Sequence, residues 1–288
     1  MNFAQSILDL FSFAMQIAYD FLTKDMQQFA PHVARVMEVI NNGLQAFSYA
    51  LLVILTLWNV VKTTSSYTEL KRPEVAVKLF IRFVLTKYAI GAAWSLVNNI
   101  FVISGALTSA VFRFSGMTDG NVWAGMTVPE FGDDGILGII SDVASFLNPL
   151  SQIPGLVLGL IGFIVAIVLS VTLILTVVGR FFKIYMYAAL APIPLSSFGS
   201  ESTQSMGQNF LKAFVAISVE GLVIAIAMIV FAAYSEAPLI TFDGLGVFQW
   251  VGNAAEEITY TFTLIFNMLI LLVVVKGTDQ SVHKIFGV

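Results

Sequence analysis

Residues 155–179 read GLVLGLIGFIVAIVLSVTLILTVVG, and this stretch decides the fold class of the chain. It carries no charged side chain. A helix of that length rises about 37 Å, which is enough to cross a bilayer hydrocarbon core about 30 Å thick. Four further stretches are predominantly apolar: 43–61, 88–112, 213–234 and 260–275. The sequence therefore predicts an all-α polytopic membrane protein with about five transmembrane helices.

Lysine and arginine fall mainly on one side of these five spans. With the N-terminus placed outside, 11 of the 14 basic residues lie inside. Because cytoplasmic loops carry an excess of Lys and Arg, we expect the N-terminus outside and the C-terminus inside. Six basic residues follow the first span, where they set the topology and contact anionic lipid, or dock a cytoplasmic partner, or attract nucleic acid. These six are Lys62, Lys71, Arg72, Lys78, Arg82 and Lys87.

The first 40 residues are predicted to form an external amphipathic helical segment, followed by a transmembrane helical domain over residues 41–288. In Phe3–Leu22 apolar side chains recur at steps of three and four residues, which is typical of a helix with one apolar face. Its polar face contains Asp9 and Asp20, unlike the Lys/Arg-rich face of helices that bind anionic headgroups. The helix is expected to pack on the outer ends of the spans or to dock a partner outside the membrane.

Ile184–Gly199 is apolar but is not predicted to cross the membrane. Its apolar run is 16 residues long, and Pro192 and Pro194 each remove a backbone donor and clash with the preceding turn. We expect a re-entrant or interfacial element that returns to the cytoplasmic face. Non-helical backbone at membrane depth must be covered by protein or face water. This Pro-broken segment is therefore also a candidate functional region.

Small residues recur at four-residue steps in the third and fourth spans. At this spacing two helix backbones can approach closely in lipid. The pattern predicts helix packing, either within the chain or with a second copy. The residues are Gly155, Gly159, Gly162, Ala166 and Ser170 in the third span, and Gly221 and Ala225 in the fourth.

Glu220 is the one carboxylate inside a predicted span. A charged group in the bilayer costs roughly 3 kcal/mol unless it is neutralised, paired or in contact with water. Glu220 can bridge helices as a neutral or paired group, or it can line a conduit or couple to protons. At about 10 Å from the cytoplasmic end of its predicted span, it is expected to lie away from the membrane midplane. The candidate conduit or coupling residues are Glu220, Lys212, Arg180 and Lys183.

Motifs for catalysis on nucleotides or metals are missing from the sequence. No Cys occurs, and neither G-x-x-x-x-G-K-[ST] nor H-E-x-x-H is found. We therefore expect no enzymatic activity, no catalytic residue, no metal and no cofactor. Energy for any transport would come from a partner or from an ion gradient.

A longer motif overlaps the Pro-broken segment. It consists of Leu190–Leu195 (LAPIPL), a polar patch at Ser200–Gln208, and a Phe-Leu-Lys entry into a long span at 210–212. Over residues 185–230 this pattern resembles the TrbL-like family, the polytopic inner-membrane components of conjugative type IV secretion systems, also called VirB-six-like. The order of amphipathic N-terminus, about five spans and cytoplasmic tail also fits that family.

The resemblance implies a non-enzymatic subunit of a machine that moves DNA, or protein attached to DNA, out of a bacterial cell. The partners it implies are membrane lipids, further copies of the chain, other secretion-system membrane subunits, cytoplasmic ATPases and single-stranded DNA in transit. Two other classes stay open. One is a secondary transporter or small-ion channel that uses Glu220, and the other is a passive membrane scaffold.

Overall fold

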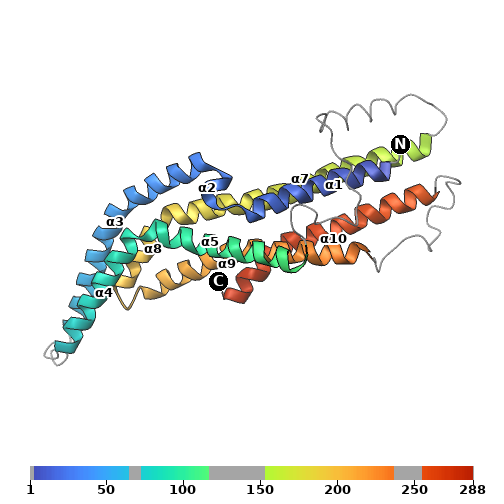
Figure 1. The fold of residues 1–288 in the computed structure, drawn as a ribbon. Coiled ribbons are helices and arrows are strands. Elements are labelled where there is room, and N and C mark those ends of the chain that lie inside the picture. Colours follow the sequence, from blue (N-terminus) through green and yellow to red (C-terminus); the bar gives the residue numbers. More distant parts are fainter. Residues whose placement is uncertain (1–2, 65–72, 117–152, 237–254, 288) are drawn as a thin grey trace. The chain divides into compact units, whose positions relative to one another are not determined.

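The structure is a computed structural model that describes residues 3–64, 73–116, 153–236 and 255–287, and in these ranges every regular element is a helix (Figure 1). The predicted all-α fold class is confirmed. The elements are α1 (Phe3–Thr23), α2 (Met26–Phe29), α3 (Pro31–Thr64), α4 (Pro73–Gly91), α5 (Ala93–Phe114), α7 (Ile153–Leu190), α8 (Pro192–Ser196), the 3-10 helix η1 (Ser197–Gly199), α9 (Gln204–Glu236) and α10 (Ala255–Phe286).

Five of the described helices are long enough and apolar enough to cross a membrane, as the sequence predicts. Their apolar segments are Pro31–Lys62, Ala93–Phe114, Leu160–Leu190, Gln204–Tyr234 and Phe262–Phe286. Each overlaps one predicted span. The chain is therefore a multi-pass membrane protein.

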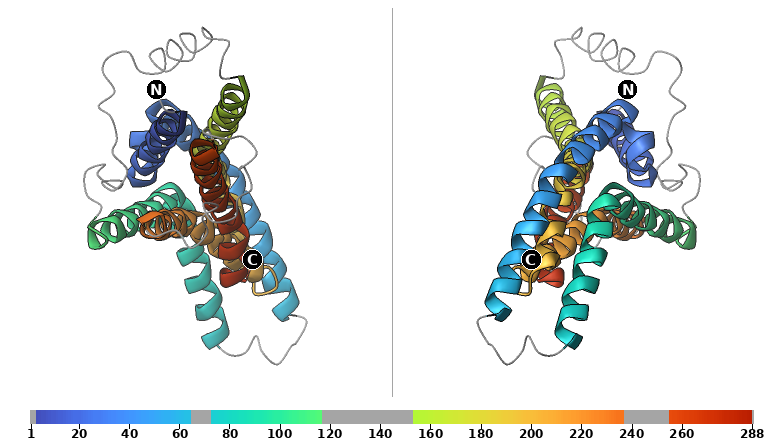
Figure 2. Two further views of the ribbon diagram at one scale, coloured as in Figure 1. Left: turned by 90° about the vertical axis from the view of Figure 1, so that its right-hand side faces the viewer. Right: turned by 90° about the vertical axis from the view of Figure 1, so that its left-hand side faces the viewer.

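The second predicted span, residues 88–112, is divided between two helices. Figure 2 shows α4 and α5 running in different directions on either side of Ala92. Ala92 N–H still donates to Tyr88 O, at an N···O distance of 2.9 Å. Gly91 sits at this bend, where a Cβ would lie 3.0 Å from the Tyr49 hydroxyl of α3. A larger residue at Gly91 would therefore crowd the Tyr49 hydroxyl.

The third span extends further than the sequence predicts. Its predicted end was Gly179, before the charged Arg180 and Lys183, whereas α7 continues to Leu190. Neither charged residue breaks the helix, because Arg and Lys are good helix formers. Pro192 is the first residue that cannot continue it. Consequently residues 184–190 of the expected re-entrant element belong to α7, and the break falls at Ala191.

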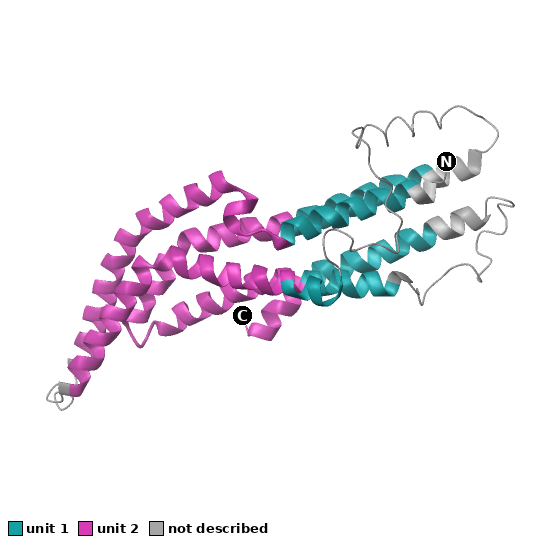
Figure 3. Cartoon of the chain, in the orientation of Figure 1, with its two compact units in different colours: residues 1–22, 110–177, 224–277 teal, residues 23–109, 178–223, 278–288 magenta. Residues whose placement is uncertain are grey.

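The chain divides into two compact units, shown separately coloured in Figure 3. Unit 1 contains residues 1–22, 110–177 and 224–277, and unit 2 contains residues 23–109, 178–223 and 278–288. This division differs from the boundary expected at residue 40. The reason is that the first helix packs with segments far along the chain, while residues 23–40 join unit 2.

Unit 1 is held together by an apolar core to which α1 contributes one whole face. The core also contains Phe112 and side chains from residues 163–177, 224–232 and 268–275. Tyr19 packs edge-on against Phe112, with ring centroids 4.7 Å apart. The amphipathic pattern at the N-terminus is thus accounted for by packing within the unit. The buried residues of α1 in this core are Ile7, Phe11, Ala14, Met15, Ala18 and Leu22.

The small-residue pattern of the third span also faces this core. Gly162 and Ser170 are buried, and Ala166 belongs to the core cluster together with Ala225 of α9. For these residues the packing partners lie in the same chain. Gly155 and Gly159 lie in α7, but their surroundings fall outside the described part of the structure.

In unit 2 the Pro-broken segment is covered by protein. Both α8 and η1 contact α3 and α4, and Pro192, Pro194 and Leu195 are buried. Pro192 has no N–H, so the Ala188 carbonyl four residues earlier loses its usual helical donor. The Asn41 side chain of α3, which is 0% exposed, donates to that carbonyl at an Nδ2···O distance of 2.7 Å. Asn41 therefore ties α3 to the helix break.

The hydrogen bond from Asn41 to the Ala188 carbonyl predicts that substitutions at Asn41 and Pro192 have non-additive effects on the free energy of unfolding. Replacing Asn41 with Leu leaves the Ala188 carbonyl without a donor, and we expect a loss of about 1–3 kcal/mol in the free energy of unfolding. In a Pro192→Ala background the new N–H can bond Ala188, so the same replacement should cost clearly less. Unfolding of the purified variants in detergent measures this double-mutant cycle.

The neighbouring Asn42 provides the control because it is exposed. Asn42→Leu should show no coupling to Pro192→Ala. Equal losses for Asn41→Leu in both backgrounds would contradict the proposed tie.

Candidate functional site

A buried arginine lies inside the long apolar segment of α7. Arg180 is 1% exposed, and its guanidinium carbon lies 5.2 Å from the ring centroid of Phe101 and 5.7 Å from that of Phe181. Its Nη2 donates to the Ser218 carbonyl at 3.3 Å, whereas Nε and Nη1 have no hydrogen-bond partner among the described residues. The sequence-based limit of the third span placed Arg180 outside the membrane segment. The apolar segment Leu160–Leu190 of α7 extends beyond that limit and contains Arg180.

Glu220 of α9 is 3% exposed and lies close to the middle of the apolar segment Gln204–Tyr234. The charges of Lys183, Asp279 and Arg180 act on it. Its Oε2 is buried and has no hydrogen-bond partner in the described ranges. Because α9 begins nine residues before the predicted span, Glu220 is central in its helix, not near one end.

The C-terminal helix α10 brings two further titratable groups to the same place. Lys183 Nζ lies 3.1 Å from Asp279 Oδ1, and His283 Nε2 lies 3.4 Å from the same oxygen. We refer to Arg180, Lys183, Glu220, Asp279 and His283 as the charge cluster. It contains two cations, two carboxylates and one imidazole from three helices of unit 2.

Three of the four residues that the sequence singled out meet in the charge cluster: Arg180, Lys183 and Glu220. The fourth, Lys212, is exposed on α9. Sequence reasoning missed Asp279 and His283, which were assigned to a cytoplasmic tail. Their separation of four residues, which places both on one helix face, was the available signal.

The backbone of Gly221 provides the space for the Arg180 side chain. A Cβ at Gly221 would overlap Nη1 and Cζ of the Arg180 guanidinium. The guanidinium is enclosed by two aromatic rings and the Ser218 carbonyl, which also accepts a hydrogen bond from Ser104 Oγ. Gly221 was predicted as a helix-packing residue, and its close neighbour in the structure is this buried cation.

Gly221→Ala should therefore displace Arg180 and destabilise unit 2. Gly179→Ala is a matched control, since a Cβ at Gly179 meets nothing within 4 Å. Replacing a helical Gly with Ala otherwise stabilises a helix by about 1 kcal/mol. We expect a lower unfolding temperature in detergent for Gly221→Ala and an unchanged or higher one for Gly179→Ala. The reverse order would contradict the position of the guanidinium.

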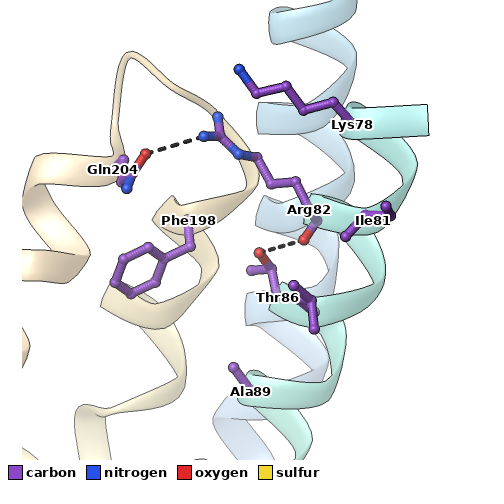
Figure 4. A pocket seen from close by; sticks show the side chains of 8 residues that line it. Lys78, Ile81, Arg82, Thr86, Ala89, Phe198 and Gln204 are labelled. Atoms are coloured by element: carbon purple, nitrogen blue, oxygen red, sulfur yellow. Dashed lines mark hydrogen bonds between the residues drawn. The ribbon is translucent and has the colours of Figure 1, made fainter. Parts of the chain in front are cut away.

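A second feature of unit 2 is an open groove of about 380 Å³ between α4 and the η1–α9 connection. Figure 4 shows Arg82 reaching across it to Gln204, while the Phe198 ring on the other side points away from α4. That ring lies against Gly207 of α9. Arg82 Nη2 donates to Gln204 Oε1 at 3.2 Å. The lining residues are Lys78, Ile81, Arg82, Leu85, Thr86, Ala89, Phe198 and Gln204.

Glu201 bridges the two cations of this groove. Its Oε1 lies 3.0 Å from Lys78 Nζ and 3.5 Å from Arg82 Nη1. The hydrogen bond and charge of Lys78, together with the charge of Arg82, hold the pKa of Glu201 below its usual value. Lys78 and Arg82 are two of the six basic residues predicted to have topogenic or docking roles. Lys62 and Lys87 are exposed, and Lys71 and Arg72 lie outside the described residues.

The described residues contain no group of three or more His, Cys, Asp or Glu side chains placed to hold a metal ion. Comparison of the chain with family models, with curated proteins and with solved structures gave no match. The functional argument therefore depends on the residues of unit 2 themselves.

Proposed function

We propose that this chain is a non-enzymatic membrane subunit of a type IV secretion or conjugation machine, located in the bacterial cytoplasmic membrane with its N-terminus outside. The observation that carries the proposal is where the TrbL-like motif lies. Residues 185–230 cover the end of α7, α8, η1 and most of α9. These elements contain the helix break and contribute Glu220 to the charge cluster. The motif thus coincides with the elements that organise unit 2.

Exposed apolar faces on α3 and α4 support a role within a larger membrane assembly. Large apolar side chains on both helices are solvent-exposed in the isolated chain, and such faces must contact lipid or other membrane proteins. Further copies and other secretion-system membrane subunits are the partners we propose, with cytoplasmic ATPases supplying energy and single-stranded DNA as cargo. The most exposed of these side chains are Val39, Phe47, Ile54, Leu57, Trp58, Val61, Phe80, Leu85 and Tyr88.

A secondary transporter or small-ion channel is the second candidate, and the charge cluster favours it. Ionisable groups within membrane helices commonly mark ion or proton pathways. Glu220 and Arg180 are both buried, and each has side-chain atoms without a hydrogen-bond partner among the described residues. In this alternative the cluster binds an ion or a proton, and no secretion partner is required.

A DNA-transfer assay on a deletion strain distinguishes the two candidates. If the secretion proposal holds, deletion of the gene should abolish transfer, and the wild-type chain should restore it. Pro192→Ala combined with Pro194→Ala should restore it poorly, because the break that α3 and α4 cover would be lost. Lys212→Gln serves as a control, since Lys212 is exposed and outside the charge cluster.

Membrane levels of each variant must be measured beside transfer, so that loss of protein is separated from loss of function. Unchanged transfer in the deletion strain would contradict the secretion proposal. Solute uptake by the purified chain in liposomes, abolished by Glu220→Gln, would then support the transporter.

A further inference from the structure

One end of the groove in unit 2 is lined by two basic side chains, and most of the rest of the groove is lined by apolar side chains. Lys78 and Arg82 are four residues apart on α4, so both cations lie on one helix face. Ile81, Leu85 and Ala89 continue along α4 at the same spacing, and all five residues line the groove. From Lys78 to Ala89 the helix rises about 16 Å. The groove therefore joins a site for an anion to a strip for an apolar chain.

We propose that this groove binds one anionic phospholipid, with its phosphate at Lys78 and Arg82 and an acyl chain along Ile81, Leu85 and Ala89. This inference is independent of the secretion proposal. A soluble phosphate would use the cations but not the apolar strip. A zwitterionic lipid would use the strip but has no net charge to attract the cations. Only an anionic lipid matches both ends of the groove.

The surroundings of the groove favour a lipid over a protein or nucleic-acid ligand. The α4 side chains Phe80, Val84 and Leu85 are exposed. On a helix that lies at the membrane surface, such an apolar face contacts acyl chains. Basic residues at the cytoplasmic surface are attracted to anionic headgroups, and Lys78 and Arg82 belong to the set that the positive-inside rule places on that side.

Glu201 occupies the cationic end when no lipid is bound. Its carboxylate bridges both cations, and its side chain is 57% exposed, so little protein prevents it from moving away. Arg82 Nη1 lies 3.5 Å from the Glu201 carboxylate and makes no hydrogen bond within the described ranges, so a phosphate oxygen reaches it only by taking the place of that carboxylate. Glu201 therefore competes with the lipid phosphate for Lys78 and Arg82.

Binding of defined lipids to the purified full chain in detergent, measured by native mass spectrometry, tests this site. The probes are dioleoylphosphatidylglycerol and dioleoylphosphatidylcholine. We expect clear preference for the first. The double variant Lys78→Gln, Arg82→Gln should bind it on the order of 20-fold more weakly, since each cation near the surface contributes about fivefold. Glu201→Gln should bind it more tightly, because the internal competitor loses its charge.

Lys87→Gln is the matched control, since Lys87 is exposed on the same helix and does not line the groove. Equal weakening by Lys87→Gln would show general surface attraction and overturn the site. Weaker lipid binding by Glu201→Gln would show that the three charged residues only support the fold. Unfolding temperatures identify variants that are simply misfolded.

The apolar strip is tested separately by Ala89→Trp, which places a large ring in the groove. This variant should weaken binding of the long-chain phosphatidylglycerol and leave binding of soluble glycerol phosphate unchanged. If glycerol phosphate displaces the lipid completely from the wild-type chain at comparable concentration, the site recognises phosphate alone and the proposal is wrong.

Discussion

The carbonyl of Ala188 is the constraint on which unit 2 depends. Pro192 removes its helical donor, and Ala188 is fully buried in protein, so water does not replace that donor. Asn41 supplies the missing hydrogen bond from α3, and α8 and η1 then contact both α3 and α4. The contacts that cover this interrupted turn thus bring together α3, α4 and the α8–η1 segment, which are separated in the sequence. The groove lies beside these contacts, between α4 and the residues that follow the break.

In the same unit, the charge cluster offsets the cost of burying the Arg180 cation. A cation buried in an apolar helix is costly without nearby opposite charge or aromatic faces. Arg180 has two aromatic rings beside it, a carbonyl, and the charge of Glu220 acting on it. By contrast, the core cluster of unit 1 is built from apolar side chains. The candidate sites of the described chain therefore gather in unit 2.

Hydropathy and proline placement predicted much of this fold, because span length and helix breaks depend on local sequence. The five spans, the break at Pro192, and the residues Arg180, Lys183 and Glu220 were all identifiable. The residues that contact each other across helices could not be identified from the sequence. Asn41 resembles any polar residue in a helix, and its role depends on a carbonyl 147 residues away. Gly221 fits a small-residue motif, yet its close neighbour is a guanidinium that periodicity cannot reveal. In helices that are apolar on all sides, sequence does not distinguish faces that meet lipid from faces that meet protein.

Disulfide cross-linking in native membranes tests most directly whether α3 covers the helix break. The chain has no Cys. A Cβ at Gly199 would lie 3.2 Å from Thr56 Oγ1 of α3 and 2.5 Å from Leu52 Cδ1, so the end of the Leu52 side chain must shift to admit Gly199→Cys. The side chain of residue 56 thus reaches the place where a side chain at residue 199 would begin, as a disulfide between the two positions requires. The pair Thr56→Cys with Gly199→Cys should therefore cross-link efficiently under mild oxidation, whereas Ile54→Cys with Gly199→Cys should not, because Ile54 is exposed on another face of α3. Equal cross-linking of both pairs, or none in the first, would contradict this packing.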